Sequence, residues 1–211
     1  QGCTGIPVTF TDQSNGNGAG ITSWYWNFGD GTSSTVQHPS HSYSSAGNYT
    51  AYLIISTAAG CSDTAVRTLS IGQQPVAQFS VTNGCAGSNF TFTNQDPSSA
   101  ASWTWDLGNG TTSSVVSPVV QYSNAGTYTV TLTGSSSNGC SASSSRTVTV
   151  YPLPAADAGA DRTLCAGSST TLSATGGSNY TWIPGGSGSS LTVQPASTTN
   201  YILIATNAAG C

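Results

Sequence analysis

The chain has 211 residues, with three arginines, no lysine and a formal net charge of −4. Three cationic side chains cannot neutralise a run of phosphates, so the composition excludes a basic surface for nucleic acid or for anionic lipid, and we expect no membrane insertion. Only 5% of the residues are charged and 36% are apolar, which favours a folded all-β protein over a disordered one.

The predicted elements of the first third of the chain are strands joined by turns. A strand is expected over residues 6–11, and a polar loop over 12–20 follows it. Trp24, Trp26 and Phe28 then alternate with smaller or polar side chains, so a strand of period two places these three aromatics on one face. A Gly-Asp-Gly turn comes next. Two further strands are predicted at residues 49–55 and 64–71, separated by an Ala-Gly-Cys turn.

The same series of elements recurs 79 residues later. WYWNFGDGTSS, which begins at Trp24, corresponds to WTWDLGNGTTS, which begins at Trp103. A strand at 76–81 precedes the second copy, and its other strands are predicted at 103–107, 127–133 and 145–150. The duplication indicates a tandem array of domains of about 75 residues each.

The last part of the chain is related to the two copies without repeating them. It keeps a cysteine near its start, a Tyr180-x-Trp182 strand and a Tyr201-x-Leu203 strand that leads to AAGC, but it lacks the Gly-Asp-Gly turn. We therefore predict three domains, with the first strand missing from the first domain and the last strand missing from the third. The domains span residues 1–73, 74–152 and 153–211.

The first copy carries the motifs WNFGDGTSS, HPSHSY and AGNYTAYLII. This pattern resembles the PKD domain, an immunoglobulin-like β-sandwich of extracellular proteins, and the resemblance covers residues 1–152. The second copy departs from it at Leu107 and Asn109. The resemblance implies an all-β fold of three tandem immunoglobulin-like (PKD-type) β-sandwich domains. The third domain looks like the immunoglobulin-like repeats that accompany PKD domains in very large bacterial surface proteins exported by the type IX route.

Six cysteines fall two to a domain. They allow fifteen pairings, but only a scheme with one disulfide within each domain is consistent with the duplication. The chain has no CxxC motif, which argues against metal binding by the cysteines. We predict the pairs Cys3–Cys61, Cys85–Cys140 and Cys165–Cys211. Persistent disulfides imply an oxidising compartment, so we expect an extracellular or cell-surface location.

Few residues are candidates for metal binding. His38 and His41 lie three apart in one loop, but a metal needs further ligands and the second copy has no histidine at either position. Asp30 could help to bind Ca²⁺, as the resemblance to PKD domains suggests. Because Asn109 replaces Asp30 in the second copy, turn formation is the favoured role. No other cofactor is predicted.

No catalytic residue is predicted, because the chain has no GxSxG motif and no paired nucleophile and base. Trp26 and Trp105 are expected in the cores, where an immunoglobulin-type domain packs a tryptophan against its disulfide, whereas Tyr25 points to the opposite face and is a candidate for an exposed contact. Possible glycosylation sites are Thr64, Asn48, Asn89, Asn109 and Asn179.

These features predict a non-catalytic structural or adhesive repeat segment of an extracellular bacterial surface protein, adhesin or filament. We expect it to be a piece of a much longer chain; strand donation between identical subunits of a fibre is the alternative. Its partners would be neighbouring domains or such subunits. A different function remains open, namely a carbohydrate-binding accessory module of a secreted degradative enzyme, with surface glycans as partners. A ligand-recognition head is a third interpretation.

Overall fold

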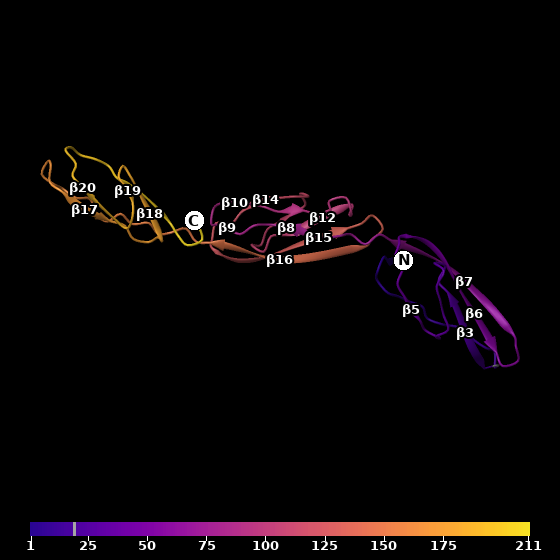
Figure 1. The fold of residues 1–211 in the computed structure, drawn as a ribbon. Coiled ribbons are helices and arrows are strands. Elements are labelled where there is room, and N and C mark those ends of the chain that lie inside the picture. Colours follow the sequence, from indigo (N-terminus) through magenta and orange to yellow (C-terminus); the bar gives the residue numbers. More distant parts are fainter. Residues whose placement is uncertain (19) are drawn as a thin grey trace.

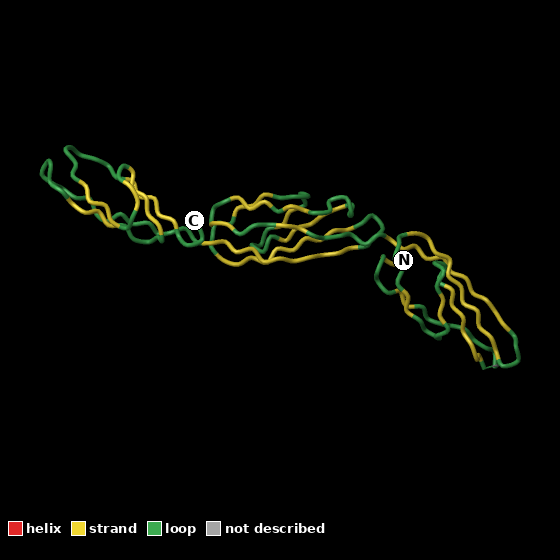
Figure 2. Tube along the Cα trace, viewed as in Figure 1, coloured by secondary structure: helices red, strands yellow, loops and turns green. Residues whose placement is uncertain are grey.

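The computed structural model describes residues 1–18 and 20–211, and these residues form strands, turns and loops without a helix (Figure 2). Three β-sheet units follow one another in an extended, bent row (Figure 1). None of the described segments is a helix of the length and apolarity needed to cross a membrane. Residue 19, in the predicted polar loop, lies outside the described residues.

The first unit is a two-layer sandwich. Its large sheet has the strand order β1-β7-β6-β3-β4, in which β1 runs parallel to β7 and the other neighbours are antiparallel; β2 and β5 pair separately. The buried core includes Phe10, Trp26, Phe28 and Leu53. The strands are β1 (Gly2–Cys3), β2 (Val8–Thr9), β3 (Ile21–Asn27), β4 (Ser33–Ser34), β5 (Ser40–His41), β6 (Gly47–Thr57) and β7 (Ser62–Gly72).

The second unit repeats this arrangement and adds a strand pair. Its large sheet has the order β13-β12-β15-β16-β9, and the pairs β10–β14 and β8–β11 lie outside that sheet. The strands are β8 (Phe79–Ser80), β9 (Gly84–Cys85), β10 (Asn89–Thr91), β11 (Thr93–Asn94), β12 (Ser102–Asp106), β13 (Thr112–Ser113), β14 (Val119–Gln121), β15 (Gly126–Ser135) and β16 (Ser141–Tyr151). Trp105 is fully buried and packs edge-on against Phe79, with ring centroids 5.0 Å apart.

The third unit has fewer strands. A three-stranded sheet of order β19-β18-β21 faces the pair β17–β20, and Trp182 lies buried among them. The strands are β17 (Thr170–Ser173), β18 (Asn179–Ile183), β19 (Gly186–Ser187), β20 (Ser190–Val193) and β21 (Ile202–Thr206). The predicted all-β, immunoglobulin-like tandem fold is confirmed.

A buried tyrosine holds the Gly-x-Gly turn of each of the first two units. The hydroxyl of Tyr43 donates to the carbonyl oxygen of Phe28 at 2.9 Å, and that of Tyr122 donates to the carbonyl oxygen of Leu107 at 2.8 Å. Burial raises the pKa of both phenols to about 12, so they remain protonated donors at any physiological pH. Each bond ties the end of the tryptophan-bearing strand to the opposite layer.

The predicted disulfide pairing is wrong. The bonded pairs are Cys3 with Cys140 and Cys85 with Cys211, at Cα separations of 5.8 and 5.6 Å, and Cys61 and Cys165 are free and exposed. The bonds therefore connect successive units, and none lies within a unit. The three pairs Cys3–Cys61, Cys85–Cys140 and Cys165–Cys211 are all replaced by this arrangement.

The length of one strand explains the error. Cys3 is in register with Gly72 at the end of β7, whereas Cys61 directly precedes the first residue of β7. An 11-residue strand therefore separates the two cysteines, a distance on the order of 35 Å. A disulfide needs Cα atoms about 4.4 to 6.8 Å apart. The same geometry separates Cys85 from Cys140, because Cys85 is in register with Tyr151 at the end of β16.

Trypsin can distinguish the two pairings directly. Its cuts follow the three arginines and leave fragments 1–67, 68–146 and 163–211, each with two cysteines. We expect the unreduced, alkylated chain to keep these three fragments together in one species, because both bonds cross between fragments. Mass spectrometry before and after reduction measures this. Three separate fragments before reduction, none of them alkylated at a cysteine, would show that each bond lies within a unit.

Candidate functional site

The junction between the first and second units combines covalent and polar contacts. The turn between β15 and β16 lies against the end of β7, and its Cys140 is bonded to Cys3 in β1. The side-chain amide of Gln74 donates to the carbonyl oxygen of Ser141 at 2.7 Å. A Cβ atom on Gly72 would lie 2.2 Å from Nδ2 of Asn138, so a glycine at this position gives room for the turn.

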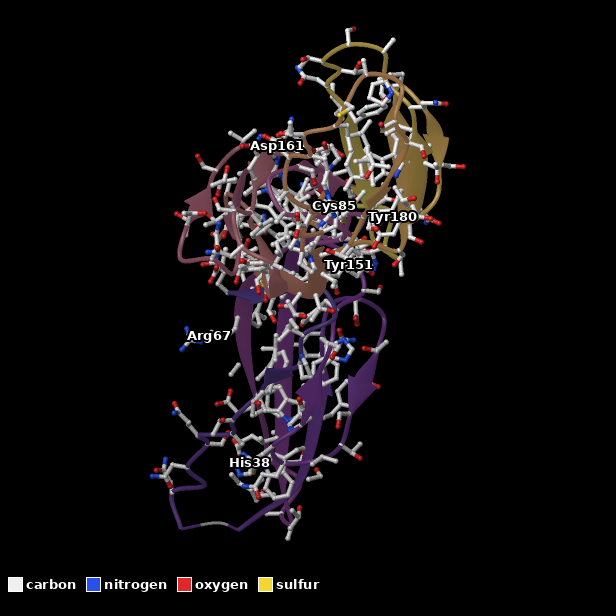
Figure 3. The ribbon with its side chains drawn as sticks, turned by 90° about the vertical axis from the view of Figure 1, so that its left-hand side faces the viewer. His38, Arg67, Cys85, Tyr151, Asp161 and Tyr180 are labelled. Atoms are coloured by element: carbon white, nitrogen blue, oxygen red, sulfur yellow. A yellow bond between two sulfur atoms is a disulfide. The ribbon has the colours of Figure 1, made fainter. Side chains whose placement is uncertain are left out.

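The second junction is built in the same way. The turn that follows β21 ends at Cys211, which is bonded to Cys85 in β9. The side-chain amide of Asn207 donates to the carbonyl oxygen of Pro152 at 2.7 Å. Figure 3 shows Cys85 close to Tyr151 where the second and third units meet, in agreement with their pairing in the sheet. At both junctions a cysteine in the short strand that pairs in parallel with the end of one unit's last strand is thus bonded to the turn of the next unit.

These junctions restrict motion between units. A short peptide linker alone would leave a hinge, whereas a linker plus a disulfide attaches each unit to the next at two points. These contacts therefore limit how far each unit can turn relative to the next. Sequence reasoning found the four cysteines but not their partners.

The structure brings together two of the three candidate metal residues. Asp30 and His41 lie together, with Oδ2 and Nε2 2.6 Å apart, and the His41 ring stacks on Phe28 at 4.2 Å. The other carboxylate oxygen of Asp30 accepts from the N–H and the hydroxyl of Thr32. His38 lies apart and accepts from the N–H of Asp12 through Nδ1.

The residues around Asp30 do not fit a calcium ion, which takes six to eight oxygen ligands. They supply one carboxylate, whose two oxygens already accept bonds. No group of three or more His, Cys, Asp or Glu side chains gathers within residues 1–18 and 20–211. Asn109 makes the same two bonds to Thr111 in the second unit. Turn formation is therefore the role that the geometry supports for Asp30.

Asp12 is a structural centre that sequence reasoning missed. Its carboxylate accepts from the indole N–H of Trp24 at 2.7 Å, the side-chain amide of Gln37 at 3.1 Å and the backbone N–H of Ser14 at 2.9 Å. Partial burial raises the pKa of Asp12, but these hydrogen bonds outweigh it and lower the pKa to about 2. In the sequence, Asp12 is simply the first residue of a polar loop, and an aspartate in that position usually indicates a turn. Nothing in the sequence indicates that it binds Trp24.

The aromatic residues lie on the predicted faces. Trp26 and Trp105 are buried, but Trp105 packs against Phe79 and Phe92 and not against a disulfide. Tyr25 is 40% exposed, and its ring centroid lies 6.4 Å from that of Tyr52 on the neighbouring strand. The five residues with glycosylation motifs are all exposed, namely Thr64, Asn48, Asn89, Asn109 and Asn179.

Comparison with known proteins shows that the chain matches one protein family. A family model described as PKD domain matches residues 1–71 and again residues 72–150. The microbial collagenase of Vibrio alginolyticus is 36% identical over 72 residues, which make up 34% of this chain and 9% of the collagenase. The chain thus spans less than a tenth of that relative.

Two solved structures are similar at the level of one unit. The PKD1 domain from the Vibrio cholerae metalloprotease PrtV is 34% identical, with 32% of this chain and 84% of that domain covered and a TM-score of 0.31. The PKD1 domain of Vibrio anguillarum Epp is also 34% identical, with 37% and 94% covered and a TM-score of 0.31.

The first unit should lose stability in acid before the second. The pKa of Asp12 is lower in the folded chain than its ordinary value of 3.8, so its hydrogen bonds stabilise the fold above about pH 4 and are lost as the pH falls towards 2. The pKa of Asp30 is lowered too: partial burial raises it, but bonds from Thr32 and His41 outweigh that effect. In the second unit the equivalent Trp103 donates to a backbone carbonyl, that of Pro97, which does not titrate.

Calorimetry between pH 5 and pH 2 measures this difference. The transition of the first unit is expected to move to lower temperature with acid, and Asp12→Asn should flatten that dependence. Asp63→Asn, which changes an exposed carboxylate of the same unit, serves as the control. An Asp12→Asn variant with the acid sensitivity of the wild type would contradict the role given to Asp12.

Proposed function

Because the chain belongs to the PKD domain family, we propose that it is a non-catalytic spacer segment of an extracellular bacterial surface protein, adhesin or filament. PKD domains are in general accessory modules of secreted proteins. The third unit acts in this proposal as an immunoglobulin-like repeat that continues the array, and export by the type IX route and glycosylation of Thr64 belong to the same proposal. The partners are neighbouring domains or identical subunits.

One observation carries the proposal: both disulfides join neighbouring units. A bond between units adds little to the core of either one, but it fixes the angle between them. Such bonds are expected in a protein whose task is to keep its ends apart. They also require an oxidising compartment, which agrees with an extracellular location.

The proposal places the domains at residues 1–73, 74–152 and 153–211. The first unit contains a cavity of about 350 Å³ lined by Phe10, Trp26 and Arg67. In the second unit the side chain of Phe79 in β8 lies among the corresponding residues Phe92, Trp105 and Arg146. The cavity of the first unit thus lies where Phe79 packs in the second unit, which supports the proposal that the first unit has no counterpart of β8. Limited proteolysis after reduction of the two disulfides, with cuts expected near residues 73–75 and 151–154, tests the boundaries.

Opening one junction should make the array flexible. In the double variant Cys3→Ser/Cys140→Ala, the linker between the first two units is the one remaining covalent connection. Small-angle X-ray scattering should then show a broader distribution of end-to-end distances, while the free energy of unfolding of each unit changes by less than about 1 kcal/mol. Cys61→Ser, at an exposed free thiol, is the matched control. Equal scattering from the double variant and the control would count against the spacer function.

A second candidate function rests on the exposed face of the first unit. Tyr25, its neighbour Tyr52 and the 57% exposed Val66 form an aromatic and apolar surface on β3, β6 and β7. Aromatic surfaces of this kind suit the faces of sugar rings, so the alternative is a carbohydrate-binding accessory module.

A glycan array tests the alternative. Tyr25→Ala should abolish binding while the unit stays folded, because the side chain lies on the outer face of the sheet and is 40% exposed. Thr104→Ala, the equivalent position of the second unit, is the control. Binding that persists in Tyr25→Ala, or no binding by the wild type, argues against this function.

A further inference from the structure

The free Cys61 lies in the same turn as two bonded cysteines. In turns 57–61, 136–140 and 207–211, the N–H of the first residue donates to the carbonyl oxygen of the cysteine at 2.8–3.0 Å. The glycine before each cysteine has a φ of 80–84° and donates to the first residue of the turn at 3.0–3.1 Å. Cys140 and Cys211, in two of these turns, are bonded to the preceding unit. The backbone around Cys61 is therefore already arranged as in a bonded turn.

The free Cys165 matches the other half of the bonded pairs. In turns 3–6, 85–88 and 165–168, the N–H of the last residue donates to the carbonyl oxygen of the cysteine at 3.0–3.1 Å. A glycine two positions after the cysteine has a φ of 75–80° in all three turns. Cys3 and Cys85 are each bonded to the following unit. Cys165 is thus the equivalent of a cysteine that bonds forwards along the array.

The two free thiols lie at opposite outer ends of the row. Cys61 follows β6 and precedes β7, and the turn between these strands forms the outer tip of the first unit (Figure 1). Cys165 precedes β17, and Gly167 in its turn donates to the carbonyl oxygen of Pro195, just after the end of β20. The labels of β17 and β20 mark the far end of the third unit (Figure 1). Each outer end therefore presents one half of a junction.

We propose that Cys61 and Cys165 are complementary halves of a further intermodule disulfide of the same kind as the two observed. The partner of Cys61 is a unit of this type that presents a Cys-x-Gly turn, and the partner of Cys165 is a unit that presents a Gly-Cys turn. A second copy of this chain carries both. This inference deepens the proposed spacer function and rests on it, because it makes the array extendable at both ends.

The bond forms by thiol–disulfide exchange with an oxidant that is itself a disulfide, such as oxidised glutathione or an oxidoreductase. One cysteine thiolate attacks a sulfur of the oxidant and releases one thiol. The second cysteine thiolate attacks the resulting mixed disulfide at the protein sulfur and releases the other thiol. Two protein thiols become one disulfide, and the oxidant takes up the two electrons and two protons.

The partner could come from two sources, namely a second copy of the chain or a unit of the same type elsewhere in a longer polypeptide. Both offer the same chemistry, a cysteine in one of the two turns. The first source predicts a bond between two peptides of these 211 residues. The second predicts a bond to a peptide of different sequence with a Cys-x-Gly or a Gly-Cys turn.

Two single variants test whether the free thiols are complementary. Cys61→Ser retains the thiol of Cys165, and Cys165→Ser retains that of Cys61. We expect an equimolar mixture in a glutathione redox buffer to form mostly mixed dimers, well above the proportion given by random pairing, with a Cys61–Cys165 peptide in the mass spectrum. The wild type should form a ladder of linear oligomers. Random pairing or glutathione adducts alone in both samples would overturn pairing between copies.

Mapping the disulfides of the protein from its native source then distinguishes the two origins. A bond from Cys61 or Cys165 to a turn cysteine, in a second copy or in another unit, supports the proposal and identifies the source. Free thiols at both positions, or bonds to cysteines outside such turns, would overturn it. Scattering separates this result from the spacer function: a stiff row of three units whose Cys61 and Cys165 stay free in the native protein refutes only the further inference.

Discussion

The arrangement of the whole chain depends on the length of one antiparallel strand pair. β6 and β7 each have 11 residues, and β15 and β16 are almost equal to them in length. The strand after the turn begins beside one cysteine of the unit and ends beside the other. The two cysteines of each of the first two units are consequently at opposite ends, and each can reach only a neighbouring unit. The row of units, the stiff junctions and the free thiols at the tips all follow from this separation.

Much of the fold could be predicted from the sequence. Alternation of Trp24, Trp26 and Phe28 located a strand and its inner face, and the duplication located the second unit. These signals are local, or they compare one segment with another, and both kinds of information are present in a single chain. The disulfide pairing was not predictable in this way. A repeat with two cysteines is equally consistent with bonds within units and with bonds from each unit to the next, and only the distance along the sheet decides between them.

The two similar units use different groups for the same structural tasks. The first holds Trp24 with the carboxylate of Asp12, and the second holds Trp103 with a backbone carbonyl. The turn after the tryptophan strand contains Asp30 in one unit and Asn109 in the other, with the same bonds to a threonine. Comparison of the two repeats identified the replacement of Asp30 by Asn109, because these two residues are aligned. It could not identify the replacement of the Asp12 carboxylate, because the group that accepts from Trp103 in the second unit is a main-chain carbonyl.

The positions of the bonds also determine how a pulling force passes through the middle unit. Tension that enters at Cys140 can leave through residue 152 along β16 alone, without passing through the rest of the sandwich. That strand is already extended: it rises by about 3.3 Å per residue, whereas a fully stretched chain reaches at most about 3.6 Å. Because β16 is nearly fully extended in the folded unit, it cannot lengthen much under tension. The second unit is therefore protected from mechanical unfolding for as long as the Cys3–Cys140 disulfide remains intact.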